Sequence, residues 1–196
     1  MDESSLEPLK VFARQLKTCH LPRWEELPDF DLYMDQVISL IERYLNILDD
    51  GKERIITSAM INNYVKLKLI PKPIKKKYNK EHIAFLIAIT LLKQILTISE
   101  VRDGIAYQAR ISGTHNAYNL YCDEQEQAFQ SCAIQILKDA SLPMNTDIPH
   151  DCMVVKMAAQ ALAQKLVAQN IVYLQRIEIK QEEKQYEPTE NSDFNG

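Results

Sequence analysis

The sequence predicts an all-α protein, a helical bundle in which minor β structure is expected only in one lysine-rich loop. Apolar residues recur at i, i+3 and i+4 in several stretches separated by prolines, which is the spacing of helices with one buried face. Of the 196 residues, 46% are hydrophobic, enough to bury a core in one to two domains. Only 4 residues are glycine, so Rossmann and P-loop folds, which need glycine-rich phosphate cradles, are excluded.

Residues 1–30 predict an N-terminal arm that packs on the rest of the chain. A short amphipathic helix is expected from Leu6 to Leu16, and Pro22 and Pro28 then interrupt regular structure. The next helix, over residues 32–48, has its apolar residues on one face. We expect Asp29 or Asp31 to cap its start, and Gly51 to follow its end in the left-handed conformation.

A short third helix is expected from Ser58 to Leu69. Thr57 or Ser58 can begin it, and Pro71 and Pro73 stop it, because proline removes a backbone donor. At 100° per residue the helix has two different sides. The side expected to pack holds Ile61, Tyr64 and Val65. The opposite side offers amides and a lysine, and consists of Ala59, Asn62, Asn63 and Lys66.

Residues 71–78 predict an extended basic loop or a small hairpin. Asn79 then serves as the N-cap of a long apolar helix over residues 80–96, with His82 at its third position. The charge pattern sets this part of the chain apart. Residues 52–80 hold nine lysines and arginines against the single acid Glu53, whereas the protein as a whole has a net charge of -4. One short stretch is therefore strongly basic within an acidic protein.

The second half of the chain predicts further helices. A short helix starts at Ser99 and stops near Gly104, residues 106–120 form an irregular connection, and a helix over residues 123–140 ends at Pro143. The strongest helical pattern runs from Met153 to Ile179. Its expected seam is rich in small residues and consists of Val154, Met157, Ala158, Ala161, Leu162, Lys165 and Val172. We expect residues 181–196, which are polar and lack periodicity, to be disordered.

A short polar-faced helix, a proline stop, a basic loop and a long apolar helix occur in the order of a winged helix-turn-helix. Such a module places one helix in the major groove of DNA and a basic wing on the phosphates. The stretches that carry this pattern are Thr57–Tyr64, Leu69–Pro71, Lys76–His82, residues 83–96 and Thr97–Val101. They resemble the MerR-type DNA-binding domain, with Lys68 standing where that family has a glycine.

The chain as a whole is similar to a bacterial family, domain of unknown function eighteen thirty-six. Ile-Asn-Asn-Tyr-Val-Lys and Lys-Lys-Tyr-Asn-Lys-Glu-His-Ile are the stretches typical of it. We therefore expect an N-terminal arm over residues 1–30, a region over 31–104 that the resemblance implies to be a MerR-like winged helix-turn-helix, a C-terminal helical region over 105–179 and a disordered tail over 180–196. The C-terminal region would serve dimerisation or the binding of a small-molecule effector.

Carried over by position, the resemblance implies a set of DNA-binding residues. Tyr64 would pack the recognition helix. Ser58, Asn62, Asn63 and Lys66 would face the groove, and Lys72, Lys75, Lys76 and Lys77 would lie on phosphates. Tyr78 has two candidate roles, packing in the core or contacting a phosphate through its hydroxyl. Duplex DNA is the expected partner, and a homodimer is the expected assembly because palindromic sites favour two-fold proteins.

Other functions find less support in the sequence. The alternative is a protein-interaction module that uses the lysine face to dock an acidic partner. No nucleophile motif or carboxylate pair points to an enzyme, and no cofactor is expected. Cys122, Cys132, His150 and Cys152 form no Cys-x-x-Cys pair, so we expect no metal site. The chain shows no signal peptide, and its most apolar run is about half the length of a membrane span, so a cytoplasmic location is expected.

Overall fold

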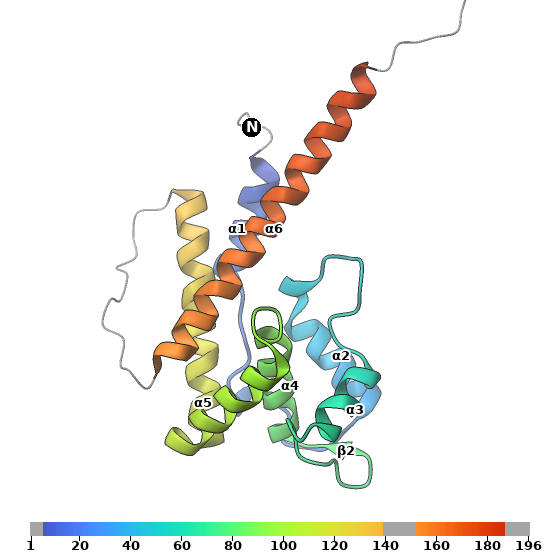
Figure 1. Ribbon diagram of the computed structural model, residues 1–196, viewed down its shortest axis with the longest axis vertical. Helices are drawn as coiled ribbons and strands as arrows, with labels where there is room; N and C mark the ends of the chain where they lie inside the picture. Colours follow the sequence, from blue (N-terminus) through green and yellow to red (C-terminus); the bar gives the residue numbers. More distant parts are fainter. Residues whose placement is uncertain (1–5, 139–151, 187–196) are drawn as a thin grey trace, which may run out of the picture.

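The described parts of the chain, residues 6–138 and 152–186, form α-helices, two short 3₁₀ turns and a two-stranded sheet in a computed structural model (Figure 1). The all-α expectation is confirmed, and the small sheet involves the lysine-rich segment. The elements follow in the order α1 (Glu7–Thr18), η1 (Trp24–Glu26), β1 (Leu32–Tyr33), α2 (Met34–Tyr44), η2 (Asn46–Leu48), α3 (Ser58–Lys66), β2 (Lys77–Tyr78), α4 (Lys80–Leu92), α5 (Ile98–Leu137) and α6 (Met153–Tyr186).

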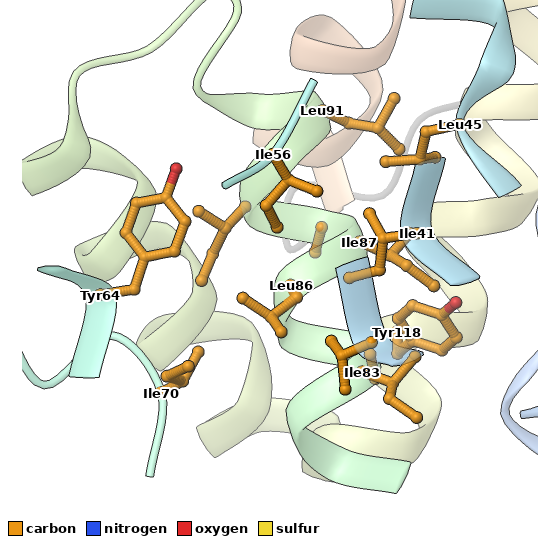
Figure 2. Packing of buried hydrophobic residues seen from close by; sticks show 14 of the residues in the cluster. Ile41, Leu45, Ile56, Tyr64, Ile70, Ile83, Leu86, Ile87, Leu91 and Tyr118 are labelled. Atoms are coloured by element: carbon orange, nitrogen blue, oxygen red, sulfur yellow. The ribbon is translucent and has the colours of Figure 1, made fainter. Parts of the chain in front are cut away.

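The larger hydrophobic core surrounds α4 (Figure 2). This helix is apolar on every side, as is typical of a buried helix. The elements α2, α5, α6 and β2 all contact it. Ile41 and Leu45 approach α4 from α2 and its C-cap, and Ile56 and Ile61 approach from the start of α3 and the residues before it. Each fully buried side chain of this kind contributes about 1.5–3 kcal/mol relative to an exposed one. The helices α2, α3 and α4 therefore share one hydrophobic core.

A second core joins α1, the C-terminal half of α5 and the first part of α6. Its members include Leu16 from α1, Phe129 from α5 and Ala159 and Ala163 from α6. Alanines on α6 let the helices approach closely, and the first part of α6 crosses the C-terminal half of α5, beyond which the two helices diverge (Figure 1). Leu166 contacts both cores, so the chain packs as connected layers.

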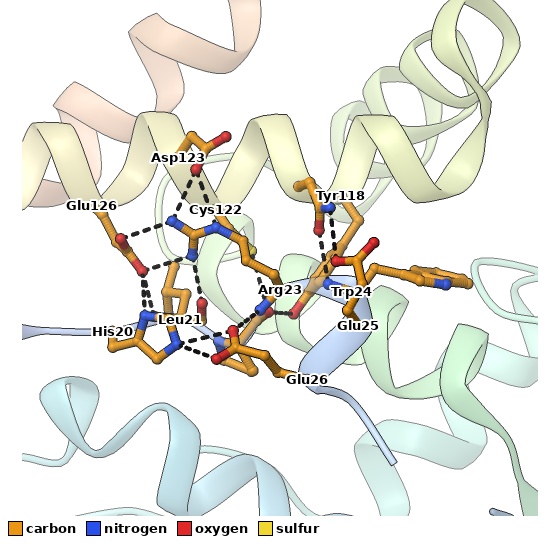
Figure 3. A network of polar contacts seen from close by, with 12 residues as sticks. His20, Leu21, Arg23, Trp24, Glu25, Glu26, Tyr118, Cys122, Asp123 and Glu126 are labelled. Atoms are coloured by element: carbon orange, nitrogen blue, oxygen red, sulfur yellow. Dashed lines mark hydrogen bonds and ion pairs between the residues drawn. The ribbon is translucent and has the colours of Figure 1, made fainter. Parts of the chain in front are cut away.

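The N-terminal arm is fixed to α5 by a polar network, which confirms that it packs on the rest of the chain (Figure 3). The Arg23 guanidinium donates to both carboxylate oxygens of Glu126 at 2.7 and 2.8 Å and to Asp123 at 2.9 Å. The Leu21 N–H donates to the same Glu126 carboxylate at 2.7 Å. Although burial opposes it, this hydrogen bonding lowers the pKa of Glu126. The Tyr118 hydroxyl donates to the Pro22 carbonyl at 2.7 Å.

The expected irregular connection over residues 106–120 is wrong, as is the stop near Gly104. Both stretches belong to α5, which is interrupted only at Gly113 with φ 78° and ψ 155°. The polar residues that suggested a loop are used in tertiary contacts. Asn119, for example, accepts a hydrogen bond from the Trp24 N–H at 2.8 Å. Contacts with the arm therefore override weak helical propensity here, and the expected limit of the winged region at residue 104 lies inside a helix.

Several helix ends also differ from expectation. Helix α2 begins at Met34, and its start is capped by Gln36, whose side-chain oxygen accepts from the Tyr33 N–H at 2.9 Å, and not by Asp29 or Asp31. Helix α3 stops at Lys66 and α4 at Leu92, each short of the expected end. Gly51 has the expected positive φ of 70°. The helix expected to reach residue 140 ends at Leu137, and Pro143 lies outside the described residues.

Helix α6 differs in both phase and length. Its buried face is formed by Val155, Ala158, Ala159, Leu162 and Ala163. Of the expected seam, Ala158 and Leu162 are buried as expected. Its members Val154, Met157, Ala161 and Val172 are instead exposed. An alanine-rich pattern does not fix which side packs, because alanine fits both faces. The helix continues to Tyr186, so disorder from residue 181 is wrong as far as Tyr186, and residues 187–196 lie outside the described part.

Candidate nucleic-acid interface

Helix α3 presents the polar face that its sequence predicts. Thr57 is the N-cap, and its hydroxyl oxygen accepts from the Met60 N–H at 3.2 Å. Ile61 and Tyr64 are buried and Val65 is half-buried, which confirms the packed side. The exposed residues of the opposite side are Ser58, Ala59, Asn62, Asn63 and Lys66. The two amides and the lysine are therefore accessible to a partner.

The end of α3 places one further lysine in an unusual conformation. Lys68 has φ 58°, and the Leu69 and Lys68 N–H groups donate to the Tyr64 and Val65 carbonyls at 2.9 and 3.1 Å. This pattern is a Schellman motif, whose left-handed position normally holds glycine. Lys68 is exposed, whereas Leu69 and Ile70 are buried directly after it. The turn therefore directs a lysine outward from a position that costs a non-glycine residue about 1–2 kcal/mol.

The basic loop forms a hairpin with two lysines at its tip. Ile74 and Lys77 form an antiparallel bridge, and the Lys77 N–H donates to the Ile74 carbonyl at 2.9 Å. Lys75 and Lys76 between them have φ 49° and 63°. Two-residue turns with both φ angles positive strongly favour Asn-Gly or Asp-Gly. Here two lysines adopt this conformation, and Ile74 beside them is 74% exposed.

The base of the hairpin is anchored in the core. β2 pairs antiparallel with β1, with Leu32 opposite Tyr78 and Tyr33 opposite Lys77. Tyr78 is buried and lies edge-on to the His82 ring, so its ring matches the core-packing role and is not part of the exposed surface. Lys77 is half-buried, and its Nζ lies over the ring of the exposed Tyr33. These contacts fix the hairpin relative to α2, which β2 also touches.

Asn79 and His82 form the expected cap of α4. The Asn79 side-chain oxygen accepts from the His82 N–H, and the His82 Nδ1 accepts from the Asn79 N–H, both at 3.2 Å. Because the ring is buried, the pKa of His82 is lowered, and the Pro71 carbonyl and the nearby acids Glu81 and Asp31 only partly oppose this shift. His82 contacts the hairpin through the Tyr78 ring and belongs to α4, and its lowered pKa favours the neutral ring at neutral pH.

The lysines of this surface have no ion-pair partners within the described part of the chain. No described carboxylate lies within 4.0 Å of Lys66, Lys68, Lys72, Lys75 or Lys76. Earlier cations of the same basic segment are paired, Lys52 with Asp50 at 3.4 Å and Arg54 with Glu42 at 3.6 Å. The basic segment thus divides into a neutralised part and an unneutralised part. The five lysines without partners, together with the exposed α3 residues Ser58, Asn62 and Asn63, are called the lysine surface below.

The hairpin and α3 lie at the same end of the molecule (Figure 1). Both contact α2, and Tyr64, Ile70 and Tyr78 belong to one hydrophobic cluster. The structure thus places the predicted residues Ser58, Asn62, Asn63, Lys66, Lys72, Lys75, Lys76 and Lys77 in one region and removes Tyr78 from its exposed part. Sequence reasoning missed Lys68, Ile74 and Tyr33. For Lys68 a signal was present in the resemblance noted above, because the MerR-type domain has a glycine at the matching position.

The connection between α2 and α3 is longer than a helix-turn-helix requires. Residues 45–57, which include η2, separate the two helices, whereas the compact motif uses a turn of about three to four residues. Both helices nevertheless contact each other, and α4 contacts α2.

Other candidate sites carry little chemistry. In the part of the chain with described coordinates, no three His, Cys, Asp or Glu side chains are placed to hold a metal ion. The four cysteines are free thiols, and burial raises the pKa of Cys122 to about 12 and that of Cys19 to about 11, so both stay protonated. His150 lies outside the described residues. Among the described helices, none has the length and apolar character needed to span a bilayer.

Comparison with known proteins gives one family. A family model described as Domain of unknown function (DUF1836) matches residues 22–137, which is more than half of the chain and includes α2, α3, the hairpin and α4. Neither a curated protein nor a solved structure matches the chain.

Proposed function

The chain belongs to the family Domain of unknown function (DUF1836), and from the surface that this member presents we propose that it is a cytoplasmic transcriptional regulator of MerR-like type that binds duplex DNA. The observation that carries the proposal is the lysine surface. Exposed amides of α3 lie at the same end of the molecule as lysines without ion-pair partners among the described residues.

In this proposal α3 is the recognition helix. A helix of this width fits the major groove, where Asn can pair bidentately with adenine and Lys can contact guanine. Asn62, Asn63 and Lys66 are the groups that would contact base edges, and Ser58 at the start of the helix would face the same groove. Tyr64 on the opposite side holds the helix against the core.

The hairpin would contact the phosphates. Lys72, Lys75 and Lys76 are exposed and Lys77 is half-buried at its base. Left-handed lysines at the tip support a functional role, because local strain persists mainly where function requires it and Asn-Gly would form this turn at lower cost. Three or four phosphate contacts per subunit would give log K against log salt a slope near -3 per subunit.

Fluorescence anisotropy with a labelled random duplex at about 50 and 200 mM salt tests the proposal. Wild-type protein should bind at micromolar concentration or better, and more weakly at the higher salt. The informative variant is Lys75→Asn with Lys76→Gly, which gives the tip its preferred turn sequence while removing two charges. We expect this variant to unfold at a higher urea concentration than wild type and yet to bind DNA with a salt slope smaller by about 2.

The matched control removes two cations that already have partners. Lys52→Gln with Arg54→Gln changes the net charge equally, but these side chains are paired with Asp50 and Glu42. The control should leave the salt slope close to that of wild type. Equal losses in both variants would show unspecific attraction to any cation, and no binding by wild-type protein at micromolar concentration would reject the DNA proposal. The latter outcome favours a protein-interaction module with an acidic partner.

A homodimer completes the proposal. The last described side chains of α6 include Val172, Tyr173, Ile177 and Ile179, each at least 36% exposed. At 100° per residue these four share one arc of about 160° on the helix. Arg176 and Lys180 lie within the same arc, so the arc is of mixed character, and its four exposed apolar side chains are the ones that a second copy would cover by two-fold symmetry.

A further inference from the structure

A hollow of about 360 Å³ lies away from the lysine surface, between α4, both halves of α5 and the start of α6. Gly113 breaks α5 into two segments, and residues on each side of the break line the hollow. Each of the three helices contributes small lining residues: Ala84 and Ala88 from α4, Gly104 and Ala117 from α5, and Ala158 from α6. Their short side chains leave space between the helices.

The lining offers rings and methyl groups and few polar atoms. Phe85, Tyr107, Tyr118 and Tyr121 supply its aromatic walls. The Tyr118 hydroxyl donates to the Pro22 carbonyl at 2.7 Å, and the Tyr121 hydroxyl donates to the Gln125 side chain at 3.3 Å. The Glu100 carboxylate accepts from the Thr97 N–H and hydroxyl, both at 2.8 Å. These three polar groups are engaged with the protein, and the other polar side chains of the described lining are Tyr107, Gln108 and Thr114.

We propose that this hollow binds one neutral, apolar small molecule. Its volume is at the lower end of the range of about 300–1,000 Å³ that small-molecule sites occupy. Ordered water is a poor occupant, because a buried water needs two to four polar partners. A charged ligand is also disfavoured, since the described lining residues include no Lys, Arg or His to offset the loss of its hydration, and Glu100 is already engaged.

The hollow is accessible from solvent. Val154 at the start of α6 is 61% exposed, and Tyr107 on α5 is 45% exposed, although both line it. These two side chains mark the side from which a ligand can enter. The inference does not depend on DNA binding, because none of the lining residues belongs to the lysine surface.

A neutral fluorescent probe tests the inference on the full chain. N-phenyl-1-naphthylamine becomes brighter in apolar surroundings, and wild-type protein should bind it saturably with one probe per chain. Ala88→Phe fills the hollow from α4, and Ala158→Phe fills it from α6. Each variant should weaken probe binding at least tenfold, whereas Ala106→Phe, at an exposed position on α5, should leave it unchanged.

Thermal unfolding keeps the outcomes distinct. A filling side chain that fits should leave the melting temperature unchanged or raise it, so a stable variant that no longer binds supports the site. Should one filling variant fail to fold, the other decides, because the two approach from different helices. Probe binding that does not saturate, or that persists unchanged in a folded filling variant, would overturn the proposal.

Discussion

The Lys77 ammonium lies 5.3 Å from the centroid of the Tyr33 ring, across the two strands that join the hairpin to the start of α2. This cation–π contact lies on the exposed side of the sheet, opposite the buried Leu32 and Tyr78. The hairpin is thus held from both sides, by core packing below and by a lysine over an aromatic ring above. Residues separated by more than 40 positions meet here to orient the proposed wing.

Replacing Tyr33 with leucine should loosen the hairpin. The contact is worth about 0.5–1 kcal/mol at an exposed site. Tyr33→Leu should therefore lower the free energy of unfolding by this amount, measured as a lower urea midpoint. Tyr33→Phe keeps an aromatic face and should unfold close to wild type. If leucine and phenylalanine variants are equally stable, the ring contributes only apolar area and the cation–π contact is unimportant.

Lys68→Gly should stabilise the protein. Lys68 occupies the left-handed position of the Schellman motif. Glycine avoids the steric penalty of about 1–2 kcal/mol that this conformation imposes on other residues. Part of that gain is lost, because glycine has a larger conformational entropy in the unfolded chain. A net gain of roughly 0.5–1 kcal/mol is expected from urea unfolding. Lys68→Ala serves as the control, because it removes the same charge without relieving the backbone. Equal effects of glycine and alanine would contradict the steric explanation.

Acidification should destabilise the contact between the hairpin and α4. The pKa of His82 is lowered in the folded protein from its usual value of 6.5, so the unfolded chain binds the proton more readily. Stability contributed by neutral His82 is present above pH 6.5 and is lost as the pH falls from there through the folded-state pKa. His82→Gln keeps the capping box but does not titrate. Urea unfolding between pH 7.5 and 5 should show a steeper loss for wild type than for this variant; parallel curves would contradict it.

Breaking the Arg23–Glu126 pair should release the arm. The two side chains are 24% and 14% exposed, and hydrogen bonds to charged groups of this kind contribute about 1.5–3 kcal/mol. Arg23→Met should therefore destabilise the protein within that range. The emission of Trp24, the single tryptophan, reports on the arm because its indole stacks on His115 at 5.3 Å, and it should shift before global unfolding.

Arg14→Met is the control for this prediction. Arg14 pairs with Glu7 at 3.0 Å, but both side chains are more than half exposed, so the loss should be about 0–1 kcal/mol. Comparable losses in the two variants, or an unchanged Trp24 signal in Arg23→Met, would show that the arm is held by apolar packing alone.

The proposed dimer should dissociate when charges enter the exposed arc of α6. Light scattering after size-exclusion chromatography should give a dimer for wild type and a monomer for Tyr173→Glu with Ile177→Glu. Gln164→Glu with Gln175→Glu adds the same charge outside the arc and should stay dimeric. A monomeric wild type at about 50 µM would reject this interface.

The sequence predicted the parts of the lysine surface well because each depends on local chemistry. Thr57 and Asn79 cap helices that start where expected, and the two sides of α3 follow from helical periodicity around Ile61 and Tyr64. The prolines and lysines of residues 71–78 indicated the hairpin, because proline stops helices and lysine favours solvent. None of these features required knowledge of distant residues.

Tertiary contacts decided what local patterns left undefined. The polar residues of 106–120 suggested a loop until Asn119 and Tyr118 found partners in the N-terminal arm, which lies more than 90 positions away in the chain. The packed side of α6 was likewise set by α5 and α1, since its alanines fit either phase. The sequence by itself determined helix class, the caps of α3 and α4, and the basic segment. Only the folded chain decided which lysines lack a carboxylate partner and where a hollow remains, because both depend on distances between residues far apart in sequence.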